Sequence, residues 1–188
     1  MRLFFALTFD KTSKSKLKQI QEKLKQHEIV GRYTRKENFH ITLAFIGEST
    51  QEESQQLTKI LHNLKSSCKR ITVDHLGSFY QNGRQLAWLG IEDNRAVTNL
   101  QTELIEALEQ DGFVTESRHY VPHITLARHI DKQAPLDDVK ISPLPLPIDA
   151  IALMESKTVE GKLIYRAIAE VAVSRQDKIY VIVRVSQS

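Results

Sequence analysis

Cysteine is nearly absent from this chain of 188 residues, in which Cys68 is the single example. One thiol cannot form an internal disulfide, and a chain of this length buries enough surface to fold without disulfides or a structural metal. Long apolar runs are absent too. None approaches the roughly 18 residues that span a membrane, and the N-terminus lacks the basic, apolar and small-residue order of a signal peptide. We therefore expect a cytoplasmic protein with no membrane association.

Glycine and proline are scarce, with 7 and 5 residues, which excludes collagen-like chains, and the 41% hydrophobic content excludes disorder. The net charge is only +3, but residues 1–36 hold ten Lys and Arg against three Asp and Glu. Such a concentration of basic side chains can mark a surface that attracts polyanions. A solvated helix face that carries the lysines is the alternative interpretation.

Short runs rich in apolar, β-branched and aromatic residues predict strands. The predicted strands are residues 3–9, 39–46, 71–76, 86–91, 122–127, 148–157, 163–173 and 179–185. The turn signal Asn82-Gly83 lies between two of them and predicts a hairpin with a longer loop. Four of the five prolines fall within 131–147, where periodicity disappears, and this predicts a surface loop.

Apolar residues at helical spacing predict helices over 13–28 and 94–111. Ser49 and Thr50, each with Glu three positions on, are candidate capping boxes for a further helix. One side of that helix is expected to carry Leu57, Ile60, Leu61, Leu64 and Cys68. Because helices and strands mix without a strict βαβ alternation, the predicted fold class is α+β.

The pentapeptide HITLA occurs twice, at 40–44 and again 83 residues later at 123–127. Internal duplication is the natural explanation. The same shift lays residues 3–7 on 86–90, so each half repeats a strand-helix-strand order. We predict one two-lobed domain over residues 1–188, with a pseudo-twofold, one copy of the motif in each lobe, and each lobe an antiparallel-rich sheet with helices outside.

Alternation along a strand predicts what each copy of HITLA presents. In the first copy, one face is expected to carry His40 and Thr42, and the core face Ile41, Leu43 and Phe45. The second copy repeats this pattern. If the two strands lie side by side around the pseudo-dyad, two histidines and two threonines converge on one cleft.

Such a set suits attack on a phosphodiester, which needs a base, an acid and donors for the phosphoryl oxygens. His40 and His123 can serve as either base or acid near neutral pH, and the hydroxyls of Thr42 and Thr125 can donate to non-bridging oxygens. No metal or other cofactor is required. The remaining histidines have no such context. We interpret three as structural or solvent-facing (His27, His62 and His75) and two as possible rim residues (His119 and His129).

The HxTx pair resembles the two-histidine phosphoesterase superfamily. The sequence segments RLFFAL, NFHITLAFIGE and PHITLAR narrow the resemblance to the RNA 2′,3′-cyclic phosphodiesterases, also described as 2′–5′ RNA ligase-like proteins. The similarity in element order covers nearly the whole chain, including Ser156 and Tyr165 in the C-terminal strand pair. It implies a bilobal α+β fold with the active-site cleft between the lobes, and metal-independent hydrolysis of RNA 2′,3′-cyclic phosphate ends to 2′-phosphomonoesters. It implies neither a membrane nor a protein partner.

Carried over residue by residue, the resemblance implies that His40 is the proton donor to the leaving 3′ oxygen and that His123 is the proton acceptor that activates water. Thr42, Thr125 and Arg128 would bind the phosphate. The residue of the first copy that corresponds to the arginine is a phenylalanine, so the implied site is asymmetric.

Arg118 and Tyr120, which precede the second motif, are possible contacts at the substrate rim. The ring of Tyr120 could stack on a base, and Arg118 could meet a flanking phosphate. An ordinary surface position is the alternative for each.

Three other functions remain open from the sequence. The first is a cyclic phosphodiesterase that acts on small nucleotides or on an ADP-ribose cyclic phosphate. The second is a module that binds RNA ends without turnover, which the intact histidines and threonines argue against. The third is a metallohydrolase, because His119 and His123 have i, i+4 spacing, but Pro122 opposes the helix that this spacing requires.

Overall fold

The computed structural model describes residues 1–173, and β1 (Arg2–Thr8) is one of the two inner strands of its first sheet. Every side chain from Leu3 to Leu7 is buried, as expected for an apolar strand covered on both faces. β3 (His40–Glu48) and β8 (Ala150–Val159) flank β1, and β9 (Lys162–Ala172) completes the order β3-β1-β8-β9. All pairs are antiparallel. The prediction of strand 179–185 lies outside the described residues.

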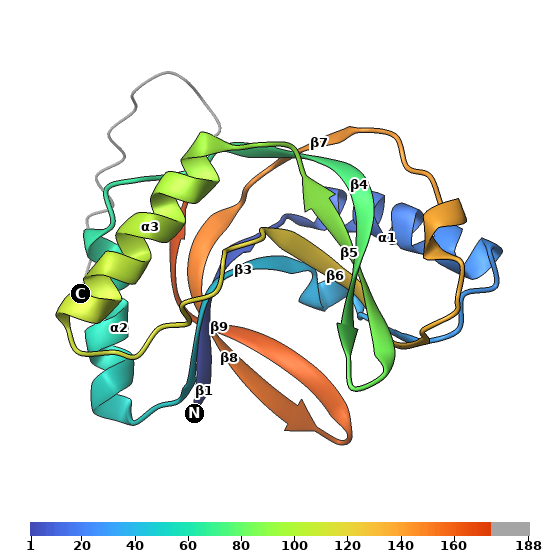
Figure 1. Ribbon diagram of the computed structural model, residues 1–188. Helices are drawn as coiled ribbons and strands as arrows, with labels where there is room; N and C mark the ends of the chain where they lie inside the picture. Colours follow the sequence, from blue (N-terminus) through green and yellow to red (C-terminus); the bar gives the residue numbers. More distant parts are fainter. Residues whose placement is uncertain (174–188) are drawn as a thin grey trace.

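The second sheet has the order β2-β6-β5-β4-β7 and is also antiparallel throughout. Its strands are β2 (Arg32–Tyr33), β4 (Arg70–Gln81), β5 (Arg84–Ile91), β6 (His123–Asp131) and β7 (Leu144–Pro147). The order β6-β5-β4 matches β3-β1-β8 of the first sheet. This confirms the predicted α+β fold with two related lobes (Figure 1).

The two halves of the sequence exchange strands. β4, from the first half, pairs with β5 in the second sheet, whereas β8, from the second half, pairs with β1 in the first. Thr8 pairs with His40 as Gly90 pairs with His123. Thr8 and Gly90 therefore hold equivalent positions, and they are 82 residues apart. The shift of 83 that fits the HITLA strands is one residue too long for β1 and β5.

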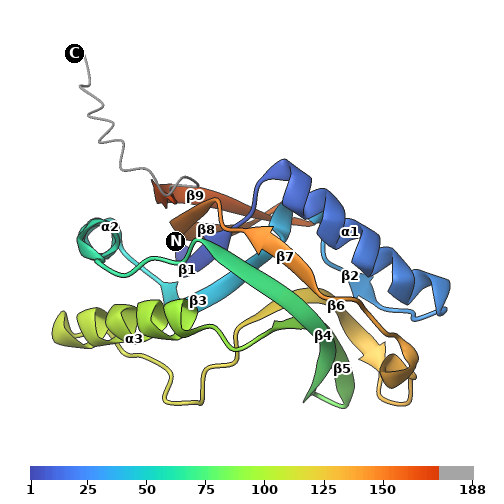
Figure 2. The ribbon, with the colours of Figure 1, turned by 90° about the horizontal axis from the view of Figure 1, so that it is seen from above.

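The helices lie outside the sheets (Figures 1 and 2). α2 (Gln51–Asn63) and α3 (Arg95–Gln110) contact each other and the first sheet. α1 (Lys11–Gln26) joins the second sheet through Gln21, whose buried amide donates to the backbone oxygens of Leu126 and Thr34. Each helix begins at a side-chain cap: Asp10 for α1, the predicted Thr50 capping box for α2 and Asn94 for α3.

Three local predictions are wrong. α2 ends at Asn63 and its C-cap Leu64 is extended, so Cys68 is buried in the connection to β4 rather than on the helix. β4 and β5 continue up to Asn82-Gly83, which makes a two-residue turn with both φ values positive instead of a longer loop. Residues 131–147 contain a short 3-10 helix, η2 (Leu136–Asp138), and β7, whose edge position tolerates its prolines.

Among residues 1–173, no helix combines the length and the apolar character that crossing a membrane requires.

Candidate active site

The two HITLA strands meet at the junction between the sheets. β3 and β6 contact each other, and each begins at its histidine, His40 or His123 (Figure 1). The hydroxyl of Tyr120, just before β6, donates to the Thr42 carbonyl of β3 at 2.8 Å. This hydrogen bond ties the two motifs together across the lobes. It also uses the polar end of the Tyr120 ring for a structural contact.

A β-bulge changes the faces that alternation predicts. In β3, Ala44 pairs with Phe5 but Thr42 pairs with Ala6, so one residue is left over between them. Leu43 and Ala44 are therefore both buried, and the following Phe45 is 41% exposed rather than in the core as predicted. The guanidinium of Arg2 lies over its ring, 5.2 Å from the centroid.

The same irregularity in β6 brings Arg128 to the junction. Leu126 and Ala127 are both buried, and the pairing with β5 shifts beside them. Arg128 is exposed, and its positive charge lowers the pKa of both His40 and His123. The guanidinium thus lies within electrostatic reach of both imidazoles, at the position where β3 has a phenylalanine.

Matching hydrogen bonds orient the two imidazoles. The Nδ1 atom of His40 lies 2.7 Å from the Asn38 carbonyl, and Nδ1 of His123 lies 2.6 Å from the Val121 carbonyl. Since a carbonyl only accepts, each Nδ1 carries the proton and each neutral ring leaves Nε2 as an acceptor. The Thr42 hydroxyl then donates to Nε2 of His40, at 2.9 Å. No residue within 1–173 pairs with Nε2 of His123.

Aromatic rings surround each imidazole. Phe4 and Tyr165 lie 5.1 Å from the His40 ring, between centroids. Phe79 and Trp88 lie 5.2 and 5.7 Å from the His123 ring. These rings place apolar surface beside both imidazoles. Of these four rings, the resemblance named only Tyr165, and it did so as part of the matching element order. The strand exchange that brings β4 and β9 to the site leaves no local sequence signal.

Burial makes both imidazoles harder to protonate. It is the main reason that the pKa of His40 falls from 6.5 to about 4, and repulsion by His123 when that ring is protonated, and by the charges of Arg128 and Lys14, adds to it. The Asn38 carbonyl acts in the opposite direction. Burial also lowers the pKa of His123, again against the effect of its backbone carbonyl. In the free protein both rings are therefore biased toward the neutral form.

A short 3-10 helix, η1 (Lys36–Asn38), holds the carbonyl that orients His40. Lys14 of α1 donates to the Glu37 carbonyl at 2.9 Å, and Lys36 donates to Ser15 at 2.7 Å. The buried amide of Asn38 donates to the Leu163 carbonyl of β9, also at 2.9 Å. Sequence reasoning missed this support, because contacts between α1, η1 and β9 have no local signature.

The other predicted contacts are placed less centrally. Arg118 is exposed and pairs with Glu116 at 3.0 Å, whereas His119 lines a cavity beside the second motif. Thr125 follows His123 by two residues, as Thr42 follows His40.

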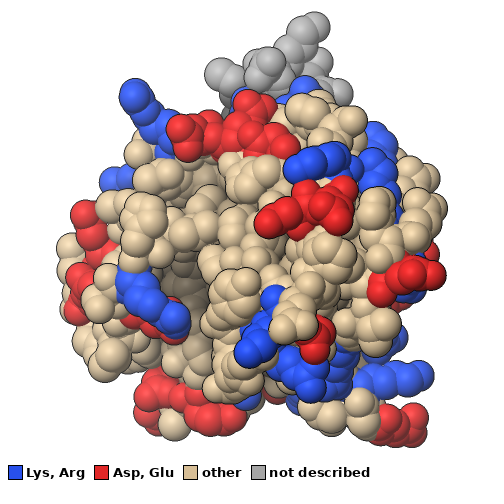
Figure 3. All heavy atoms as spheres, turned by 45° about the vertical axis from the view of Figure 1, so that its right-hand side comes forward, with Lys and Arg blue, Asp and Glu red and all other residues tan. Residues whose placement is uncertain are grey.

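The lysines of α1 are partly paired, with Lys18 and Lys25 both near Glu22. On the hollowed face shown in Figure 3, basic and acidic side chains are interspersed.

Two antiparallel lobes, each with an oriented HxT histidine at the start of one strand, define a two-histidine phosphoesterase. A family model described as "2′-5′ RNA ligase superfamily" matches residues 9–160. The chain belongs to this superfamily.

Curated relatives of this chain carry the name RNA 2′,3′-cyclic phosphodiesterase. The Thermotoga maritima protein is 29% identical over 183 residues, covering 90% of this chain and 94% of the relative. The Methanocaldococcus jannaschii protein is 33% identical over 141 residues, covering 73% and 78%. Among solved structures, Escherichia coli LigT complexed with 3′-AMP has a TM-score of 0.77 and 26% identity, covering 92% of this chain and 98% of LigT.

Proposed function

We propose that this protein is an enzyme that hydrolyses the 2′,3′-cyclic phosphate at an RNA end to a 2′-phosphomonoester, with His40 as the general acid and His123 as the general base. The observation that carries the proposal is the matched pair of Nδ1 hydrogen bonds, which leaves one Nε2 atom on each lobe available for proton transfer. The names of the curated relatives support the activity.

In the proposed reaction, Nε2 of His123 takes a proton from water as the water oxygen bonds to phosphorus. The bond between phosphorus and the 3′ oxygen breaks in line with this attack, and Nε2–H of His40 gives its proton to that oxygen. Thr42, Thr125 and Arg128 hold the non-bridging oxygens. Every proton is carried by an imidazole, so the scheme needs no metal.

The pKa of His40 decides whether this assignment works. With a pKa of about 4, the ring is neutral in the free protein at pH 7 and cannot act as an acid. A bound phosphate brings negative charge next to Nε2, which favours the imidazolium and raises this pKa. We infer that the acid is formed by substrate binding, when Nε2 takes a proton and the Thr42 hydroxyl turns from Nε2 to the phosphate.

Turnover of an oligoribonucleotide that ends in a 2′,3′-cyclic phosphate tests the proposal. His40→Ala and His123→Ala should each lower kcat by about 10²–10⁴, the usual effect of removing a positioned acid or base. His62→Ala, which removes an exposed histidine of α2, is the matched control and should leave kcat unchanged. Normal turnover in either site variant would remove that histidine from the mechanism, and loss of wild-type activity in excess chelator would favour a metallohydrolase.

A further inference from the structure

Two arginines are direct neighbours at the edge of the second sheet. Arg32 of β2 pairs with Arg128 of β6 in the antiparallel register. Side chains that are directly opposite in such a pair extend on the same face, with Cβ atoms about 4.5–5.5 Å apart, and like charges there destabilise the pairing. Both side chains are exposed, whereas Tyr33, the next residue of β2, packs against the core. The two guanidiniums therefore share the open face of the sheet.

No acidic side chain among the described residues neutralises this arginine pair. Within residues 1–173, neither guanidinium has a hydrogen bond or an ion pair. Arg118, by contrast, pairs with Glu116 at 3.0 Å. Arg166 pairs with the buried Glu155 at 2.6 Å. Two unpaired guanidiniums side by side form a binding site for phosphate groups, because each planar fork can donate two hydrogen bonds to phosphate oxygens.

Buried contacts hold the two arginines in this register. Gly31 lies so close to β6 that a Cβ atom there would be 2.8 Å from the Arg128 carbonyl oxygen. The buried amide of Gln21 donates to the Thr34 carbonyl beyond β2 and to the Leu126 carbonyl of β6. The like charges are therefore kept opposite each other by contacts in which neither guanidinium takes part.

Arg32 lies further from the reacting centre than Arg128 does. Arg128 is among the positive charges that lower the pKa of both His40 and His123, whereas Arg32 is not. Arg128 is thus placed for the cyclic phosphate, and Arg32 for a second anionic group beside it. In an RNA, that group is the phosphodiester on the 5′ side of the terminal ribose. A free nucleoside 2′,3′-cyclic phosphate has no such group.

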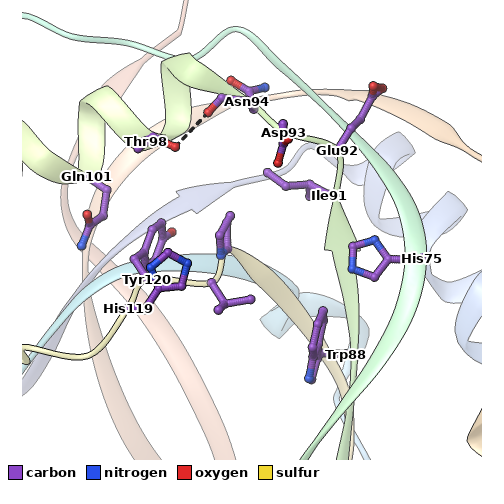
Figure 4. Close-up of a pocket in the computed structure, with 12 residues that line it drawn as sticks. His75, Trp88, Ile91, Glu92, Asp93, Asn94, Thr98, Gln101, His119 and Tyr120 are labelled. Carbon is purple, nitrogen blue, oxygen red and sulfur yellow. Dashed lines mark hydrogen bonds between the residues drawn. The ribbon is translucent and has the colours of Figure 1, made fainter.

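The cavity of about 490 Å³ beside the second motif does not suit this phosphodiester. The rings of His75, Trp88 and Tyr120 line it, and the carboxylate of Asp93 points into it (Figure 4). Among the described residues that line the cavity, none is a lysine or an arginine. Because a carboxylate repels a phosphate, the charges favour an RNA chain that leaves the site across β6 and β2.

We propose that Arg32 binds the phosphodiester that joins the 3′-terminal nucleotide to the rest of the RNA, while Arg128 holds the cyclic phosphate. The inference rests on the proposed function, because that function places the cyclic phosphate at the two histidines. Two successive phosphates also relieve the repulsion between the guanidiniums. The arginine pair then selects RNA ends over free nucleoside cyclic phosphates.

Two probes that differ only in this phosphodiester test the proposal. They are 2′,3′-cyclic CMP and its 5′-(methyl phosphate), which carries a diester without a second nucleotide. We expect the wild-type kcat/KM to be about tenfold higher for the 5′-(methyl phosphate), mostly through a lower KM, as for one charge-assisted hydrogen-bonded contact. The slope of its logarithm against that of the salt concentration should be steeper by about one for this probe.

Arg32→Gln should raise KM for the 5′-(methyl phosphate) until the two probes are turned over equally well, and should leave the kinetics of cyclic CMP as in the wild type. Arg84→Gln, which removes an exposed arginine from β5 of the same sheet, is the matched control and should keep the wild-type ratio. An unchanged ratio in Arg32→Gln would overturn the inference. An equal loss for both probes would do so too, because it would place Arg32 at the cyclic phosphate.

If the wild type turns over neither probe, the proposed function fails instead. Calorimetric binding of cytidine 2′-phosphate, with and without the 5′-(methyl phosphate), then tests the arginine pair alone. The compound with the diester should bind about tenfold more tightly to the wild type, and Arg32→Gln should abolish the difference. Equal affinities of the two compounds for the wild type would overturn the inference.

Discussion

Lowering the pH of the free protein should leave His40 neutral long after an ordinary histidine has taken a proton. The ring is partly exposed, but its Nδ1 side is enclosed by the η1 backbone and its faces are covered by Phe4 and Tyr165. This burial, with the nearby positive charges, lowers its pKa to about 4. Between pH 6.5 and 4 the folded protein should therefore bind fewer protons at this site than the unfolded chain does.

The lowered pKa of His40 sets how strongly the free energy of unfolding depends on pH. A difference of about 2.5 pKa units, at about 1.36 kcal/mol each, disfavours the protonated ring by about 3 kcal/mol. Because the folded pKa lies below the unfolded value, the unfolded state binds more protons in this window, and the free energy of unfolding falls as the pH falls from 6.5 to 4. The full loss, about 3 kcal/mol, is reached below pH 4.

Urea unfolding of the wild type and of His40→Gln at pH 7 and pH 4.5 measures this contribution. Other groups also titrate, so the quantity of interest is the difference between the two proteins. The wild type should lose about 2 kcal/mol more than the variant. An NMR titration of the His40 ring gives the pKa directly. Equal losses in both proteins, or a His40 midpoint near 6.5, would refute the account of its burial.

The same titration also tests the role of His40. Adding inorganic phosphate should move the His40 midpoint upward, because the bound anion favours the imidazolium. If phosphate binds and raises the pKa of His123 while that of His40 stays near 4, the acid and base assignments should be exchanged.

Three further predictions concern two contacts at the site and the exchange of strands between the halves. Asn38→Ala removes the amide that fastens η1 to the Leu163 carbonyl, and it should lower kcat about tenfold with little change in KM, as steady-state kinetics would show. An unchanged kcat would mean that the Asn38 side chain does not position His40. Arg128→Gln should instead raise KM about tenfold and weaken the salt dependence of kcat/KM, and an unaltered KM would place the guanidinium away from the phosphate. Because the halves exchange β4 and β8, calorimetry should show one cooperative unfolding transition, and two separate transitions would show that the lobes fold independently.

Local sequence patterns single out the candidate site residues, but the faces of their strands also depend on pairing with strands far along the chain. HITLA occurs twice, and packing alone requires its apolar residues but not its histidine and threonine. The bulge in each copy depends on pairing with a strand far along the chain, so simple alternation placed Phe45 in the core. The same bulge brings Arg128 to the junction.

The exchange of strands between the two sheets explains most of the site contacts that local sequence patterns did not predict. Phe79 and Tyr165 reach the histidines because β4 and β9 join sheets built mainly from other parts of the chain. His75 is exposed, in keeping with its interpretation as structural or solvent-facing, but its place in the cavity depends on Gly90 in the neighbouring strand, which no local pattern indicates. The proline-rich segment 131–147 hid β7, since edge pairing can tolerate proline where a central strand cannot.

The most direct test of the central claim is the identity of the product. Phosphorus NMR of the mixture formed from an oligoribonucleotide 2′,3′-cyclic phosphate separates 2′- from 3′-phosphomonoesters. With His123 activating water and His40 protonating the 3′ oxygen, the product should be the 2′-phosphomonoester in wild-type protein and should be lost in both histidine variants. A predominantly 3′-phosphate product would contradict the assignment, because it requires the acid to stand beside the 2′ oxygen.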